Sequence, residues 1–198
     1  MPGQPAEPAR VDLYWVPLGA GEAFPIVRWN GRLFERVAAW REGRLPCDLY
    51  HAALQVWLGD VRFTVEMAPA WGADHADRGV VSEGPVGLRW LRHSRFFRYE
   101  IRRWRGGVIP DLASAVGGPR PVTRDLDCAR RLLDLVPSFP TATWGRDEMA
   151  TGDMWNSNSL VAWLLAHAGI DTGDVAPPAH GRAPGWSAGL ITAARLHS

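Results

Sequence analysis

Residues 158–169, NSLVAWLLAHAG, would form a helix that is apolar on nearly every side, and this feature constrains the fold more than any other. A helix without a polar face is stable only when other elements cover it all round. Gly169 predicts the end of the helix, because glycine readily adopts the left-handed conformation that follows a last helical turn. We therefore expect a central, buried helix.

The stretch LYHAALQVWLGDVRFTVEMAP, residues 49–69, predicts a β-hairpin. Gly59 and Asp60 lie between two alternating runs, which is a signal for a tight turn. One face of the hairpin is apolar and is expected to be buried: Ala52, Leu54, Val56, Leu58, Val61, Phe63, Val65 and Met67. The other face holds His51, Ala53, Gln55, Trp57, Arg62, Thr64 and Glu66. His51 is expected opposite or diagonal to Glu66, at cross-strand distance.

The remaining patterns predict strands at 11–19, 96–104 and 188–195, and helices at 30–43 and 123–140, the last with Thr123 as its cap. This order indicates an α+β fold, with a mostly antiparallel sheet packed against the buried central helix. Residues 1–10 are proline-rich and are expected to form a disordered tail, whereas residues 11–198 are expected to form a single domain.

Composition excludes several kinds of chemistry. All 22 basic residues are arginine, which rules out a catalytic lysine, and the net charge of +1 gives no reason to expect a nucleic-acid partner. The two cysteines, Cys47 and Cys128, are too few for a disulfide scaffold, and no Cys-x-x-Cys or His-x-x-x-His spacing predicts a structural zinc site. We expect no cofactor and no metal.

The sequence also predicts a soluble cytoplasmic protein without stable membrane insertion. No apolar run approaches the roughly 20 residues that span a bilayer. The first ten residues, MPGQPAEPAR, lack the apolar core of a signal peptide. The oligomeric state stays open.

The start of the apolar helix, MWNSNSL at 154–160, has two interpretations. In the first, Asn156 or Ser157 caps the helix by accepting its first free N–H groups. In the second, Ser157 is a nucleophile at the positive end of the helix dipole. The N–H groups of Ser157 or Asn158, with the Asn156 side chain, would then hold an oxyanion.

A serine nucleophile needs a base, and His51 is the best placed histidine in the chain. It lies at the head of an apolar strand, on the polar face, with Glu66 as a carboxylate that could orient the imidazole. The alternative interpretation is a half-buried surface histidine beside a solvated glutamate in a cross-strand pair.

These segments resemble the circularly permuted papain-like fold, which includes PPPDE-type peptidases and lecithin:retinol-acyltransferase-like enzymes. The resemblance rests on LYHAALQV (49–56), on the following strand up to Pro69, and on WNSNSLVAWLLAHAG (155–169). In the PPPDE-like pattern the helix opens with Asn-Cys-Asn, and here it opens with Asn156, Ser157 and Asn158. The resemblance implies a hydrolase or acyltransferase that acts on an amide or ester bond, with His51 as base and Ser157 as nucleophile.

The serine in the cysteine position leaves three alternatives open. Ser157 is a true nucleophile, or the chain is a catalytically inactive papain-like binding module, or serine has replaced a native cysteine. For the enzyme, the resemblance implies a peptide, protein or lipid-like acyl substrate. Three tryptophans are candidate walls of its groove: Trp155, Trp71 and Trp57.

The arginine-rich segment 89–107, RWLRHSRFFRYEIRRWRGG, also has several interpretations. It could bind phosphate or nucleic acid, or an anionic substrate headgroup. We favour an exposed strand face in a chain that has no lysine to share its positive charge.

Overall fold

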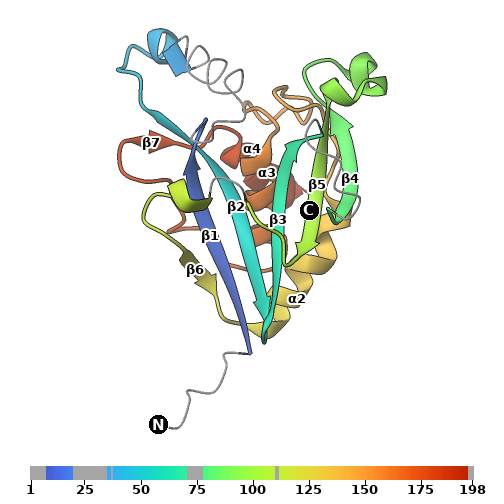
Figure 1. The fold of residues 1–198 in the computed structure, drawn as a ribbon. Coiled ribbons are helices and arrows are strands. Elements are labelled where there is room, and N and C mark those ends of the chain that lie inside the picture. The colour runs from blue at the N-terminus through green and yellow to red at the C-terminus, as the bar shows by residue number, and fades with distance from the viewer. Residues whose placement is uncertain (1–7, 20–34, 37, 71–77, 110–111, 196–198) are drawn as a thin grey trace.

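The structure is a computed structural model that describes residues 8–19, 35–36, 38–70, 78–109 and 112–195. These residues form an α+β fold with a seven-stranded sheet, in which the main strand order is β4-β5-β3-β2-β1-β6 (Figure 1). The strands are β1 (Ala9–Pro17), β2 (Asp48–Leu58), β3 (Val61–Pro69), β4 (Val80–Pro85), β5 (Arg98–Arg105), β6 (Arg120–Thr123) and β7 (Gly181–Arg182). Neighbours in this order are antiparallel, and short β7 runs parallel to the start of β2. The predicted fold class is confirmed.

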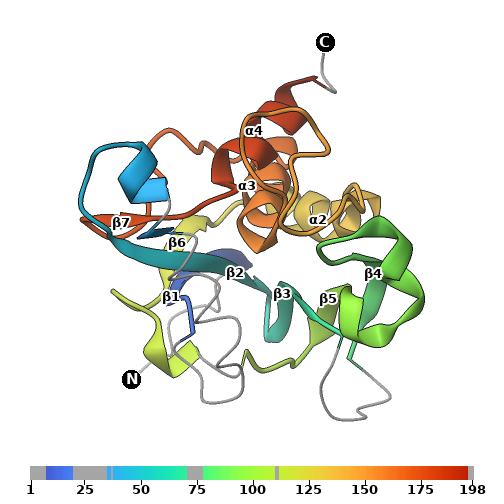
Figure 2. The same cartoon turned by 90° about the horizontal axis from the view of Figure 1, so that it is seen from above.

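Three α-helices cover one face of the sheet, as the view from above shows (Figure 2). They are α2 (Leu126–Leu135), α3 (Ser157–His167) and α4 (Trp186–Arg195). Short 3₁₀ turns complete the described elements: η1 (Arg89–His93), η2 (Arg95–Phe97), η3 (Leu112–Ser114) and η4 (Val136–Ser138). The α-helices pack on this face because the apolar side chains of the strands point to it.

The predicted hairpin is present, and its two faces lie as expected. Leu58 pairs with Val61 across Gly59 and Asp60, and Gly59 has a φ of 56°, which a tight hairpin turn requires. Of the apolar face, Ala52, Leu54, Val56, Val65 and Met67 are core residues, and Leu58 and Phe63 pack against that core. The apolar face therefore fixes the register, because a slip by one residue would turn His51 and Glu66 toward the helices.

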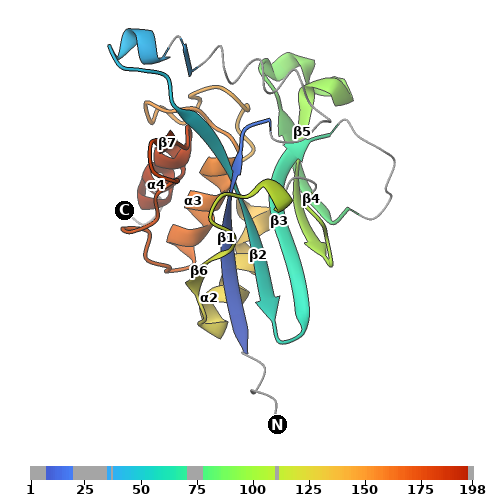
Figure 3. The ribbon, with the colours of Figure 1, turned by 60° about the vertical axis from the view of Figure 1, so that its left-hand side comes forward.

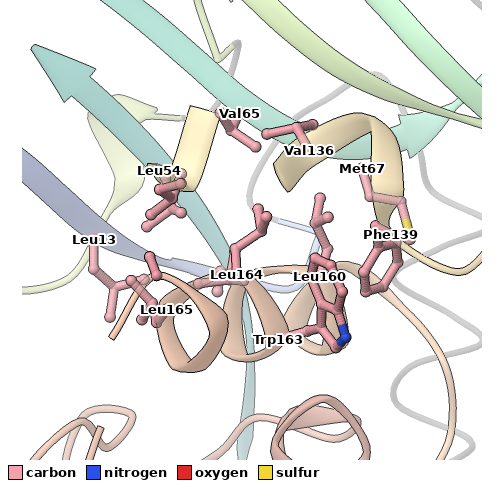
Figure 4. Close-up of a cluster of buried hydrophobic side chains, with 14 of the residues drawn as sticks. Leu13, Leu54, Val65, Met67, Val136, Phe139, Leu160, Trp163, Leu164 and Leu165 are labelled. Carbon is pink, nitrogen blue, oxygen red and sulfur yellow. The ribbon is translucent and has the colours of Figure 1, made fainter. Parts of the chain in front are cut away.

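Helix α3 is the central buried helix that its composition predicted. Every residue from Ser157 to Leu165 is buried, and its leucines contact side chains from the strands and from α2 and η4 (Figure 4). Each fully buried leucine contributes roughly 1.5–3 kcal/mol to folding. Gly169 has a φ of 78° and follows the helix as expected.

Several boundaries predicted from the sequence are wrong. Residues 188–195 belong to helix α4 and not to a last strand, because a short apolar run does not distinguish the two periods. Asp125, not Thr123, caps α2: its carboxylate accepts a hydrogen bond from the Cys128 N–H at 2.7 Å, and Thr123 ends β6. Within the predicted helix 30–43, residues 35–36 and 38–41 are helical, and residues 30–34 and 37 lie outside the described part.

Helices α3 and α4 cross at a glycine. A Cβ atom on Gly189 would lie 2.4 Å from the Ser159 carbonyl oxygen, far inside van der Waals contact. The two helix backbones therefore approach so closely that no side chain fits between them.

We expect Gly189→Ala to lower the free energy of unfolding by about 1–3 kcal/mol, because the added methyl group forces the two helices apart. Helix propensity alone predicts the opposite sign, a gain of up to about 1 kcal/mol. Urea denaturation measures the difference, and Ile191→Ala on the exposed side of α4 is the control. A stabilised Gly189→Ala variant would contradict the observed helix packing.

Candidate functional site

The start of α3 carries a complete capping box. The Asn156 side-chain oxygen accepts hydrogen bonds from the N–H groups of Asn158 at 2.9 Å and Ser159 at 3.3 Å. In return, the Ser159 hydroxyl accepts one from the Asn156 N–H at 3.1 Å. The capping interpretation is thus confirmed, with Asn156 as the cap residue. Because the cap uses two early N–H groups of α3, it also decides which of them are left for a ligand.

Asn158 joins the helix start to strand β2 on both sides of His51. Its side-chain oxygen accepts a hydrogen bond from the Ala52 N–H at 2.7 Å, and its side-chain nitrogen donates to the Tyr50 carbonyl at 3.0 Å. The ladder between β2 and β3 ends at the pair Leu54 and Val65, so the two strands separate before this point. Figure 1 shows α3 behind the gap that they leave. The Asn158 carboxamide therefore satisfies β2 where β3 no longer pairs with it.

The C-terminal part of the chain closes over the same helix start. The Pro184 carbonyl accepts hydrogen bonds from the side-chain nitrogens of Asn156 at 2.7 Å and Asn158 at 2.8 Å. The Gly185 carbonyl accepts from the Ser159 hydroxyl at 2.8 Å, and the Gly185 N–H donates to Asp153 at 2.8 Å. We call residues 184–187 the clasp. A side chain at Gly185 is excluded, because its φ is 88° and a Cβ atom would lie 2.3 Å from the Asn156 side-chain oxygen.

Ser157 is the first residue of α3, and neither its hydroxyl nor its N–H group forms a hydrogen bond within the described part of the chain. Its side chain is buried, yet the hydroxyl forms no hydrogen bond with any described residue, and the N–H has no acceptor there. The Asn158 N–H and the Asn156 side chain, both predicted as oxyanion donors, are occupied by the cap and the clasp. The Ser157 N–H is therefore the one of these three donors that is left for an anion at the positive end of the helix dipole.

His51 is held neutral at physiological pH. The residue is half-buried, and burial of the imidazole lowers its pKa from about 6.5 to about 4. Strand alternation directs its side chain to the face of β2 opposite Ala52, and the ring forms no hydrogen bond with Ser157 or any other described residue. The imidazole can accept a proton above pH 4, but no carboxylate among the described residues is its partner.

Glu66 does not orient His51 in the structure. Its carboxylate accepts a hydrogen bond from Arg102 at 3.0 Å, and Arg102 also binds Glu100 at 2.8 Å. Arg102 stands directly opposite Glu66 in the pairing of β3 with β5. The predicted pair of Glu66 with His51 is wrong because it rests on β2 and β3 alone. The ionic partner of Glu66 comes from β5, on the other side of β3.

The structure does not gather the three predicted wall tryptophans. Trp155 is 1% exposed, stacks on Phe139 with ring centroids 4.7 Å apart, and donates to the Pro140 carbonyl at 3.0 Å, so it belongs to the core. Trp57 lies six residues along β2 from His51, or about 20 Å away. Trp71 lies outside the described residues. Trp186 of the clasp, which the sequence did not single out, packs against Trp15 with ring centroids 5.2 Å apart.

No group of three or more histidine, cysteine, aspartate or glutamate side chains among the described residues could hold a metal ion. No helix in that same part of the chain is long and apolar enough to cross a membrane. Comparison with protein-family models, curated proteins and solved structures found no match.

We expect Asn158→Asp to lower the free energy of unfolding by about 2–4 kcal/mol at neutral pH. The substitution keeps the acceptor for Ala52 but points a charged oxygen at the carbonyls of Tyr50 and Pro184. Chemical denaturation of both proteins measures the loss. Ser157→Ala is the matched control and should change stability by less than about 1 kcal/mol, since its hydroxyl makes no hydrogen bond to a described residue. Equal losses of stability in the two variants would contradict the role of the Asn158 hydrogen bonds in holding the start of α3 to β2.

The lowered pKa of His51 predicts a loss of stability in mild acid. Below pH 6.5 the unfolded chain binds a proton at His51, whereas the folded protein does so only near pH 4. The contribution of His51 is therefore fully present above pH 6.5 and is lost as the pH falls from 6.5 to 4. Unfolding free energies of the native chain and of His51→Gln should converge over this window, with the exposed His93→Gln as control. A constant difference would contradict the burial of the imidazole.

Proposed function

We propose that this protein is a hydrolase or acyltransferase that acts on an amide or ester bond, with Ser157 as nucleophile and His51 as base. One observation carries the proposal: Asn158 binds the backbone on both sides of His51, and Ser157 is its neighbour at the start of a buried helix. These two hydrogen bonds hold Ser157 and His51 on adjoining segments. On β2 the His51 side chain starts on the face opposite the helices, so the proposal requires that substrate binding bring the imidazole to the hydroxyl.

The reaction follows from the groups at the helix start. The Ser157 oxygen attacks the acyl carbonyl while neutral His51 accepts the hydroxyl proton. The Ser157 N–H and the positive end of α3 stabilise the negative carbonyl oxygen that forms. His51 then returns the proton to the leaving amine or alcohol, which leaves an acyl-serine. Water or a second alcohol or amine attacks this ester, again with His51 as base, and restores the hydroxyl.

A binding module is the second candidate, and the position of Glu66 favours it. Arg102 holds the Glu66 carboxylate, so no described acid stabilises an imidazolium at His51. A serine hydroxyl without a strong base is a poor nucleophile, but it is a good hydrogen-bond donor for a bound carbonyl group. In this case the same helix start would recognise an acyl or peptide group without cleaving it.

A fluorophosphonate probe distinguishes the two candidates, because it attaches covalently to an activated serine. We expect the native chain to be labelled, and Ser157→Ala and His51→Gln to lose at least about 100-fold in labelling rate. Ser138→Ala, which removes an exposed hydroxyl, should behave as the native chain. The rate should stay constant from neutral pH down to about 5 and fall with a midpoint near the His51 pKa of about 4.

Folded protein that is not labelled at Ser157, at any pH between 5 and 8, would contradict the enzymatic proposal and favour the binding module. Circular dichroism of each variant shows whether its fold is intact. Labelling that persists in Ser157→Ala would place the reactive group elsewhere.

A further inference from the structure

Four large apolar side chains are exposed together on the segment that connects β4 with β5. They are Leu88, Trp90, Phe96 and Phe97, with exposed fractions of 42%, 71%, 60% and 41%. They lie on or beside the two short turns η1 and η2, and we call them the aromatic tip. Single exposed apolar residues are ordinary on protein surfaces, but two phenylalanines, a tryptophan and a leucine exposed within residues 88–97 indicate an interaction site.

The charge along the segment of the aromatic tip itself has one sign, and the exposed Glu148 of the loop before α3 lies near Arg89. Between Glu83 and Glu100 the sequence contains Arg89, Arg92, Arg95 and Arg98 and no acidic residue. Arg89 and Arg95 are exposed, and the Arg95 guanidinium lies 5.7 Å from the centre of the Phe96 ring. Arg98 is bound to Glu83 at 3.0 Å, at the edge of the segment. The surface therefore combines apolar rings with cations, and its complement is an apolar layer beneath anionic groups.

The base of the segment is fixed to the rest of the protein. The Val86 N–H donates to the Phe97 carbonyl at 2.7 Å, and the Arg146 side chain donates to the Gly87 carbonyl at 2.8 Å. The Arg146 backbone carbonyl in turn accepts a hydrogen bond from the Trp155 N–H at 2.9 Å, directly before the start of α3. These bonds hold the two ends of the tip segment together and place it at the end of the molecule where α3 begins.

A second exposed pair points to the same end. Trp40 is 80% exposed and Leu45 is 86% exposed, and both belong to the segment that precedes β2. Figures 1 and 3 show the helical residues 38–41 and the turns after β4 projecting from one end of the molecule. Tryptophan and arginine beside exposed aliphatic groups are typical of residues that lie in the headgroup layer of a bilayer.

We propose that the aromatic tip docks this protein onto the surface of an anionic membrane. Trp90 and Phe96 enter the boundary between headgroups and acyl chains, and Arg89 and Arg95 contact lipid phosphates. The attachment is peripheral, because no helix among the described residues could span the bilayer. Leu88 favours lipid over nucleic acid, because an aliphatic side chain does not stack on bases as an aromatic ring does. The proposal does not depend on Ser157 chemistry.

The test is co-sedimentation of the full chain with phosphatidylcholine vesicles, with and without phosphatidylglycerol. We expect binding to the anionic vesicles, and a loss of at least about tenfold in affinity for the double variant Trp90→Ser, Phe96→Ser. Arg95→Gln should weaken binding roughly fivefold, and neutral vesicles should bind weakly. Val108→Ser is the matched control, because Val108 is 63% exposed but follows the opposite end of β5.

Three results would overturn the proposal. The first is no binding of the folded chain to anionic vesicles at low salt. The second is binding that the double variant retains in full, with circular dichroism showing that both proteins are folded. The third is a single-stranded RNA oligonucleotide that binds the chain and competes with the vesicles for Trp90 and Phe96, which would make the tip a nucleic-acid surface.

Discussion

The side chain of Asn158 is the contact on which the candidate site depends. One carboxamide accepts from Ala52 and donates to Tyr50 and Pro184, so three segments meet at a single group. Tyr50 and Ala52 are buried, and an unpaired amide or carbonyl there would cost about 1–3 kcal/mol. The carboxamide supplies both a donor and an acceptor in a fixed plane, which a serine or an aspartate cannot do. The position of Ser157 next to the strand of His51 is a consequence of this geometry.

The two faces of the sheet serve different purposes. The helix side is a continuous apolar core, whereas the other side buries charged groups in pairs. Arg102 contacts both Glu66 and Glu100, and Glu100 also contacts Arg78 at 3.3 Å. Such a network is stable because every charge has an opposite neighbour, and breaking one pair would leave a buried charge uncompensated. Glu66 is thus part of the scaffold that holds β3 and β5 together, and His51 lies beyond the last β2–β3 pair.

Local patterns predicted the parts of this fold that are locally determined. The alternation on either side of Gly59 and Asp60 was enough to place the hairpin and its buried face, and the composition of 158–169 was enough to identify the central helix. The cap was expected at Asn156 or Ser157, and Asn156 is the residue that caps α3. The remaining features depend on contacts that are distant in sequence. Nothing near Glu66 indicates Arg102, and nothing near Asn158 indicates Ala52, which is 106 residues away. Helix α4 was missed because its short apolar run fits either period.

The clasp places a segment that follows α3 in the sequence at the start of that helix. Pro184 and Gly185 bind Asn156, Asn158 and Ser159, which are 26 to 28 residues earlier in the sequence. During synthesis the hairpin and α2 emerge from the ribosome long before these residues do, and domains assemble as their segments become available. The side-chain nitrogens of Asn156 and Asn158 therefore lack their Pro184 acceptor until residue 184 has been translated. A nascent chain that stops short of the clasp would hold most of the apolar core but not the finished helix start, so the candidate site is completed only after the strands β1 to β6 and helix α2 have been made.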